Sequence, residues 1–179
     1  MSDVTPAASC SSSVNCWCVV LAGWMISVFA SPTFASRLAS SVSSTVERAA
    51  FSHVIPLGSV GEFAYLSPTE RKRIIELTVE AVPDGTPVVP GVSAIATRDA
   101  VEVGAFAERA GADGVLVTPH SYFPPTEETV RIYYRRLNAE LDIPIWVYDN
   151  PNTTDFAMDA EFLAGLAELG GVASVVRTW

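Results

Sequence analysis

The chain has 179 residues, of which 49% are hydrophobic, so it is long and apolar enough to bury one sizeable core. Its formal net charge of −9 argues against nucleic acid as a partner, because binding phosphates requires a basic surface. We therefore expect an acidic cytoplasmic protein whose partner is a small molecule, with no nucleic acid and no membrane.

The first fifty residues, 1–50, differ from the rest. Two Ser-rich stretches flank an apolar run of 15 residues, Cys16–Ala30. The run is shorter than the roughly 20 residues that a spanning helix needs. A secretory signal would carry a basic region, but no Lys or Arg precedes Arg37. We expect this run to form no stable element. The alternatives are a cleavable signal or an anchor within residues 16–35, and a patch on an open sheet edge.

The cysteines and the missing phosphate motifs bear on cofactors. All three cysteines, Cys10, Cys16 and Cys18, fall in the first segment. An odd number confined to one stretch is no disulfide framework, and no pair of histidines lies close enough to suggest zinc. The chain also has no GxGxxG or GxxxxGK motif, which argues against a nucleotide. We predict neither a metal site nor a cofactor.

From residue 51 onward, short apolar runs alternate with helical patterns. The first helix is the best marked, because Ser67 is a predicted N-cap, Pro68 the first helical residue and Glu70 the partner in a capping box. Further helices are predicted over residues 97–110, from about 126 to 140 and from about 159 to 169. The predicted strands are HVIPLG (53–58), PVVPGV (87–92), GVLVTP (114–119), IPIWVYDNP (143–151) and GVASVV (171–176).

The ends of these strands lie 28 to 33 residues apart, a period typical of parallel βαβ units. An open doubly wound sheet and a (β/α)8 barrel both place function at the C-terminal ends of their strands. Hydroxyl-bearing residues stand at these ends: Ser59, Ser93, Thr118, Ser121 and Tyr148. The pattern therefore predicts an α/β fold with a site at the strand ends.

Four ordered motifs carry a resemblance to a known family: PLGSVGEFAYLSPTER, PVVPGVSAIATRDAVE, AGADGVLVTPHSYFPPTEE and IPIWVYDNPNTT. Together they resemble the dihydrodipicolinate synthase / N-acetylneuraminate lyase family of pyruvate-type aldolases, from about residue 51 to 176. The resemblance implies a (β/α)8 TIM barrel. Residues 51–179 are then a partial barrel domain with strands two to six recognisable, and residues 1–50 are a non-family segment of uncertain structure.

The resemblance also implies a mechanism. In this family a lysine at the end of the sixth strand forms a Schiff base with a 2-oxo acid such as pyruvate, and a C–C bond beside the iminium then forms or breaks. Related members dehydrate sugar acids in the same way. Tyr148 matches the tyrosine that transfers the proton. Gly58, Ser59, Val60 and Gly61 match the turn that binds the substrate carboxylate.

Three departures from the family pattern matter for the site. Val60 stands where a second hydroxyl is expected, and its methyl groups cannot donate a hydrogen bond. Ser121 and Tyr122 replace two adjacent tyrosines, so only Tyr122 fills the second tyrosine's catalytic place. Thr153 and Thr154 stand where dihydrodipicolinate synthases carry an Arg, which favours a sugar-acid-like substrate. Both candidate tyrosines also have a purely structural interpretation, as a loop aromatic and a core strand aromatic.

The Schiff-base lysine is missing. The only lysine is Lys72, in the first turn of the capped helix, where we expect a solvated surface charge. Alignment puts Val176 in the Schiff-base position, and a slip of one residue would put Arg177 there. Neither side chain supplies a deprotonable primary amine. The family makes this chain a carbon–carbon or carbon–oxygen lyase, but as written we expect it to be catalytically defective.

The length of the match leaves the barrel incomplete. A typical (β/α)8 barrel has roughly 250 residues, and with only strands two to six present we expect open edges on strands two and six. Two functional hypotheses follow. The first is an inactive lyase whose substrate is pyruvate or a sugar-acid-like 2-oxo acid. The second is a non-catalytic 2-oxo-acid-binding or regulatory partial barrel. Either is compatible with a homo-oligomer.

Overall fold

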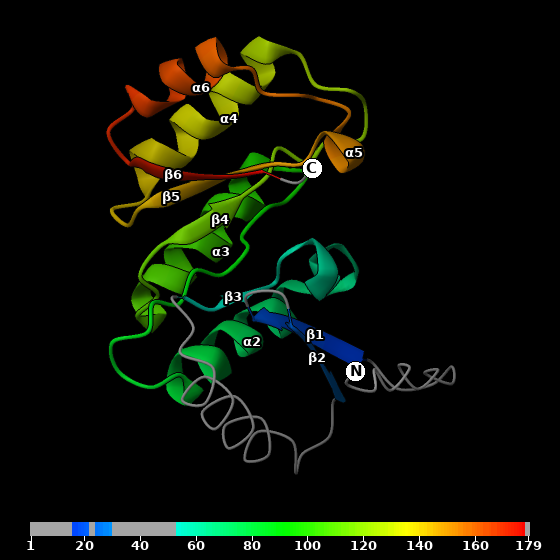
Figure 1. Cartoon of the computed structure of the whole chain (residues 1–179), viewed down its shortest axis with the longest axis vertical. Coiled ribbons are helices and arrows are strands. Elements are labelled where there is room, and N and C mark those ends of the chain that lie inside the picture. The colour runs from blue at the N-terminus through cyan, green and yellow to red at the C-terminus, as the bar shows by residue number, and fades with distance from the viewer. Residues whose placement is uncertain (1–15, 22–23, 30–52, 178–179) are drawn as a thin grey trace, which may run out of the picture.

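The structure, a computed structural model, describes residues 16–21, 24–29 and 53–177 (Figure 1). Two N-terminal strands are followed by alternating helices and strands. The strands are β1 (Cys16–Leu21), β2 (Trp24–Phe29), β3 (Ile55–Pro56), β4 (Val115–Val117), β5 (Ile145–Asp149) and β6 (Val172–Arg177). The helices are α2 (Pro68–Ala81), α3 (Thr97–Ala110), α4 (Glu127–Glu140), α5 (Pro151–Thr154) and α6 (Ala160–Ala167), with two short 3-10 turns, η1 (Ser59–Gly61) and η2 (Phe63–Tyr65).

The C-terminal half confirms the predicted βαβ units. Strands β4, β5 and β6 form one sheet in that order, and both neighbouring pairs are parallel. Helix α4 joins β4 to β5, and α5 with α6 joins β5 to β6. Figure 1 shows α4 and α6 on the same side of β5 and β6, as the outer layer of a barrel requires.

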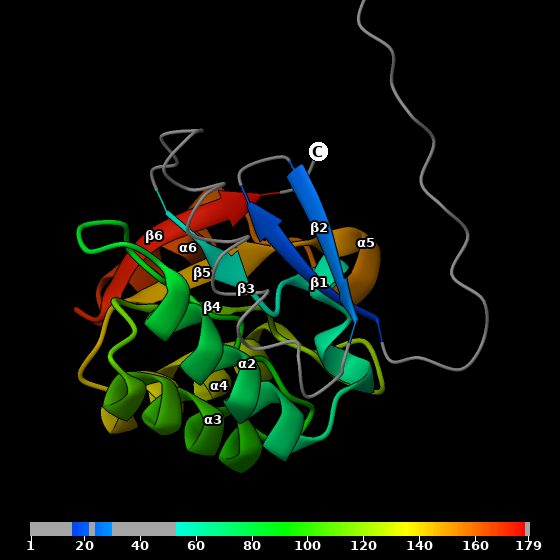
Figure 2. The same cartoon turned by 90° about the horizontal axis from the view of Figure 1, so that it is seen from below.

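The first two predicted strands are shorter than expected. Only Ile55–Pro56 forms a regular strand, and residues 87–92 make two isolated parallel bridges, to Val54 and to Leu116. The two prolines of this second segment lack the N–H groups that a regular ladder needs, which explains the interruption. Strands β3 to β6 nevertheless follow one another along the molecule (Figure 1), and α2, α3 and α4 lie on one side of them (Figure 2).

Helices α2 and α3 begin at the residues that the sequence predicts. At α2 the Ser67 hydroxyl accepts from the Glu70 N–H, and the Glu70 carboxylate accepts from the Ser67 N–H at 2.9 Å, which completes the capping box. Helix α3 has the predicted bounds. Helices α4 and α6 differ from prediction by one or two residues and are capped by Thr126 and Asp159.

The expectation that the apolar run Cys16–Ala30 forms no stable element is wrong. Strands β1 and β2 pair as an antiparallel hairpin, and β1 also pairs antiparallel with β3. The expected open edge on the second barrel strand is therefore covered by β1. Residues of high β propensity and a two-residue connection that contains Gly favour such a hairpin. The edge of β6 opposite β5 has no paired strand among the described residues.

One connected core holds the helices against the strands. Its members come from every layer, and the largest fully buried ones include Leu57, Ile75, Tyr134, Leu137, Ile145, Met158 and Leu166. Within the described residues, no helix is both long enough and apolar enough to cross a membrane. The boundary expected at residue 50 lies outside the described residues. So do residues 22–23 and 30–35 of the alternative signal or anchor at 16–35.

Candidate active site

Four strand-end residues share one register row on one face of the sheet: Ser93, Thr118, Tyr148 and Val176. Tyr148 and Val176 are direct partners across β5 and β6. Two residues earlier, Leu116 pairs with Trp146, so Thr118 falls in line with Tyr148. The Thr118 N–H donates to the Ser93 hydroxyl at 2.8 Å, which places these two side by side. We call this set the strand-end row.

The strand-end row faces away from the helices. Along β5 the buried residues Ile145, Val147 and Asp149 alternate with the half-buried Trp146 and Tyr148. Ile145 and Val147 belong to the core beneath α4 and α6, and successive strand residues point to opposite faces. Tyr148 and Val176 therefore point toward the side that forms the interior of a closed barrel.

The phenol of Tyr148 is held by its own loop. The Asn150 side-chain amide donates to Tyr148 Oη at 3.3 Å. The Asn150 carbonyl in turn accepts from the hydroxyls of Thr153 and Thr154 at 3.2 and 3.0 Å, and Asn150 is only 7% exposed. Because Asn150 donates, the phenolic proton of Tyr148 remains available to a ligand.

The two residues that align with the family's Schiff-base lysine lie on opposite faces of the sheet. Val176 faces the same side as Tyr148, whereas Arg177 pairs with Asp149 on the helix side. Arg177 Nε donates to Asp149 Oδ2 at 2.7 Å, and its guanidinium also donates to the Met158 carbonyl. Arg177 is thus held away from the strand-end row.

The predicted carboxylate-binding turn follows β3 directly. Gly58 precedes η1, Ser59 is exposed, and among the described residues no atom beyond the chain neighbours lies within 4 Å of the position that a Cβ on Gly58 would take. Two non-glycine residues in the left-handed region flank the turn, Leu57 at φ 60° and Glu62 at φ 51°. Such backbone conformations cost of order 1–3 kcal/mol each and concentrate at ligand-binding loops.

An aromatic and basic cluster supports this turn. Phe63, just after it, packs edge-on against the His120 ring, with centroids 5.2 Å apart. The Arg71 guanidinium lies 5.5 Å from the Phe63 ring centroid and donates to the Gly91 carbonyl at 3.4 Å. Burial lowers the pKa of Arg71 and also that of His120. Arg71 Nε, Thr118 Oγ1 and His120 Nδ1 have no hydrogen-bond partner among the described residues.

Tyr122 and the four turn residues 58–61 lie outside the strand-end row. Tyr122 is 81% exposed, and its ring packs edge-on against Phe123 with centroids 4.8 Å apart. For Val60 the structure describes the backbone in η1 but not the side chain. The prediction that a hydrogen-bond donor is missing at this position therefore stays a prediction. Gly61 is buried, and its N–H donates to the Gly58 carbonyl at 2.9 Å.

The single lysine is not at the strand ends. Lys72 lies on α2, where its Nζ is 2.6 Å from Glu102 Oε1 on α3 and 5.6 Å from the Phe106 ring centroid. Its side chain is 29% exposed, so it joins two helices rather than standing free in solvent as expected. The amine of Lys72 is therefore engaged with Glu102 and does not face the strand ends.

Sequence reasoning missed Asn150 and Arg71. Asn150 lies two residues after Tyr148, just past the end of β5, and this spacing indicates proximity along the chain but not a hydrogen bond between the two side chains. Arg71 gave no comparable signal, because it stands in the charged run ERKR yet is 6% exposed. Among the described residues, no three His, Cys, Asp or Glu side chains come together as metal ligands.

The parallel strands, the outer helices and a site at the strand ends define a partial (β/α)8 barrel. The chain matches the model of the dihydrodipicolinate synthetase family over residues 35–179 and belongs to this family. The match includes residues 35–50, which precede the first of the four motifs.

A curated relative gives the same assignment. An uncharacterized DapA-like lyase of Halobacterium salinarum is 40% identical over 122 residues, which is 68% of this chain and 40% of the relative. The chain spans about 40% of the length of the curated relatives that it matches.

Solved structures agree on the fold. Dihydrodipicolinate synthase from Agrobacterium tumefaciens is 30% identical with a TM-score of 0.74, over 79% of this chain and 48% of that one. A pyruvate complex of chloride-inhibited dihydrodipicolinate synthase from Acinetobacter baumannii is 24% identical, has a TM-score of 0.75, and is matched over 80% of this chain and 49% of that one.

Proposed function

We propose that this chain is a lyase-family protein whose strand-end site binds a small 2-oxo acid, pyruvate or a sugar-acid-like relative, without forming a Schiff base. The observation that carries the proposal is the pairing of Tyr148 with Val176. The row keeps the phenol and offers an alkyl side chain where the family's amine belongs. Family membership and the pyruvate bound in the Acinetobacter baumannii relative support the ligand class.

The ligand carboxylate is assigned to the turn after β3. The N–H groups of Gly61 and Glu62 donate within the turn, at 2.9 and 3.3 Å. The N–H groups of Ser59 and Val60 are therefore the donors for an incoming carboxylate, and the open space before Gly58 lets it approach. At the other end of the ligand, Tyr148 donates its phenolic proton to the C2 oxygen.

The covalent step fails at one position. Schiff-base formation needs a deprotonated primary amine facing the C2 carbonyl; Val176 has none and Lys72 is paired with Glu102. We expect the intact mass of the wild-type chain to stay unchanged after incubation with pyruvate and borohydride. Val176→Lys places an amine opposite Tyr148, and we expect it to gain the mass of one reduced pyruvate at residue 176.

Val175→Lys is the matched control. It adds the same amine on the same strand, one residue away and on the other face. Peptide mapping that finds the adduct at Lys72 of the wild-type chain would contradict the loss of covalent chemistry. Equal labelling of both lysine variants would contradict the assignment of position 176.

A further inference from the structure

Arg71 carries a buried positive charge that no carboxylate neutralises. It is 6% exposed, and none of the ion pairs among the described residues includes it. Burial lowers its pKa, and the opposing effects of Tyr133 and Asp99 do not offset this; the Asp99 carboxylate is paired with Arg98 at 3.2 Å. A guanidinium stays protonated in proteins, and burying a charge without a partner is costly. This buried cation therefore points to a role other than packing.

The guanidinium of Arg71 reaches both ends of the turn after β3. At the near end, its Nη2 donates to the Gly91 carbonyl at 3.4 Å. The Gly91 backbone is packed against Leu57, since a Cβ on Gly91 would lie 2.0 Å from the Leu57 carbonyl oxygen. At the far end, the guanidinium lies 5.5 Å from the Phe63 ring centroid. Arg71 thus bridges the two ends of the segment 57–63.

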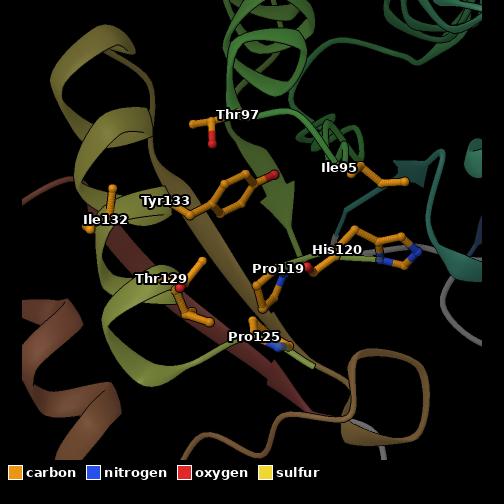
Figure 3. Close-up of a pocket in the computed structure, with 10 residues that line it drawn as sticks. Ile95, Thr97, Pro119, His120, Pro125, Thr129, Ile132 and Tyr133 are labelled. Carbon is orange, nitrogen blue, oxygen red and sulfur yellow. The ribbon is translucent and has the colours of Figure 1, made fainter. Parts of the chain in front are cut away.

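The far end of this segment is held from a second side. Phe63 also packs edge-on against the His120 ring. Figure 3, which draws the hollow lined by His120 and Tyr133, shows the His120 ring pointing away from Tyr133 and toward the segment after β3. Both partners of Phe63 come from outside the turn, Arg71 from α2 and His120 from the loop after β4. The position of Phe63 is therefore set by its surroundings.

The turn itself supplies little to fix its shape. Among the described residues, its internal backbone hydrogen bonds come from the Gly61 and Glu62 N–H groups, and η1 has no side-chain cap. Leu57 and Glu62 flank it in left-handed backbone conformations. Such conformations persist only where the surrounding structure determines them. The contacts of Arg71 at both ends meet that requirement.

We propose that Arg71 is the residue that positions this turn for an anionic ligand. Its guanidinium holds both ends of the segment 57–63, and its unneutralised charge favours a carboxylate at the Ser59 and Val60 N–H groups. The inference rests on the proposed function, because it gives the carboxylate site a supporting cation. Arg71 acts through the turn and touches no ligand atom itself.

Amide hydrogen exchange in the ligand-free full chain tests the positioning role. Arg71→Met keeps a long side chain and removes the charge and the donors. We expect the Gly61 and Glu62 amides to exchange at least about tenfold faster, because the turn opens more often, while the amides of β4, β5 and β6 exchange as in the wild type. Thermal melting should change little, because the substitution also removes an unpaired buried charge.

Arg73→Met is the matched control. It removes the same side chain from the same helix, where Arg73 is exposed and paired with Glu76 at 3.1 Å, and it should leave the turn amides unchanged. Arg71→Lys keeps a cation and a donor and should recover most of the protection. If Arg71→Met does not fold, Phe63→Leu replaces it, because it removes the ring that the guanidinium contacts and should speed exchange at the same amides.

Titration with pyruvate separates this inference from the proposed function. Arg71→Met should bind pyruvate at least about tenfold more weakly than the wild type, the effect of one unit charge acting over roughly 10 Å of protein, and Arg71→Lys within about threefold of it. A wild-type chain that binds no pyruvate would contradict the proposed function, while faster exchange at the turn would still support the positioning role. Unchanged turn exchange or unchanged affinity in folded Arg71→Met would overturn that role. An equal effect of Arg73→Met, or exchange that rises equally throughout the sheet, would overturn it too.

Discussion

Val176 and Tyr148 are partners on two neighbouring parallel strands, and in the proposed function Val176 stands where the family's lysine would supply the nucleophile. The phenol of Tyr148, which we propose as the acid–base group, accepts a hydrogen bond from the Asn150 amide at 3.3 Å. At the same scale, Leu57 and Glu62 keep left-handed backbone conformations around the turn after β3. The proposed site thus combines a phenol held by its neighbour with an alkyl side chain in place of an amine.

The half-buried ring of His120 predicts how stability depends on pH. Its pKa is lowered in the folded state because burial disfavours the charged ring. The unfolded chain therefore takes up the proton first, so stability is full above about pH 6.5 and falls as the pH drops from there toward the folded pKa. Urea unfolding between pH 7.5 and 5.5 measures this, above the range where most carboxylates titrate.

His120→Gln removes the titrating ring and should flatten that slope. His53→Gln is the matched control, because His53 is the only other histidine and its replacement leaves His120 in place. An unchanged slope in His120→Gln would show that another group is responsible.

At the scale of the elements, hydrogen bonds on both faces of the sheet hold the loop that follows β5. Asp149 ends β5 and is 2% exposed, and it receives both Arg177 from β6 and the Met158 N–H from the segment before α6. These bonds tie β5, β6 and the following loop together on the helix side. On the opposite face, the same loop holds Tyr148 through Asn150. The ion pair therefore positions the site without facing it.

Removing the arginine tests that connection. Arg177→Met leaves the buried Asp149 without its cation, and we expect a loss of about 2 kcal/mol in the free energy of unfolding, below the usual cost of breaking a buried pair because Arg177 is partly exposed. Arg136→Met breaks an exposed pair with Glu140 on α4 and should cost less than about 1 kcal/mol. Denaturant unfolding compares the two; equal losses would mean that the pair with Asp149 has no special role.

At the scale of the whole molecule, the local signals were the predictable part. The Ser67–Glu70 capping box and the periodic apolar faces gave helices within one or two residues of the structure. The hairpin of β1 and β2 was missed because a uniformly apolar run has no period from which to infer an element. Likewise, a buried Arg71 is indistinguishable in sequence from its exposed neighbour Arg73, since only tertiary packing separates them.

The candidate site was likewise predictable in its local spacing but not in its tertiary contacts. Regular spacing of the strand ends, with the family resemblance, anticipated that Tyr148 and position 176 are neighbours. Spacing could not anticipate that Tyr122 is 81% exposed, that Lys72 is paired with Glu102, or that Asn150 holds the phenol, because these depend on side-chain directions.

We propose that the strand-end site binds a 2-oxo acid. Calorimetric titration of the full chain with pyruvate tests this proposal. We predict saturable binding of one pyruvate per chain. Gly58→Ala should weaken it at least about tenfold, since a methyl group enters the space that the carboxylate needs and lost contacts of about 1.4 kcal/mol suffice for that factor. Its melting temperature should not change, because φ at Gly58 is −70° and a Cβ there meets no other atom within 4 Å. A folded wild-type chain that shows no binding, or Gly58→Ala that binds as tightly as the wild type, would contradict the account.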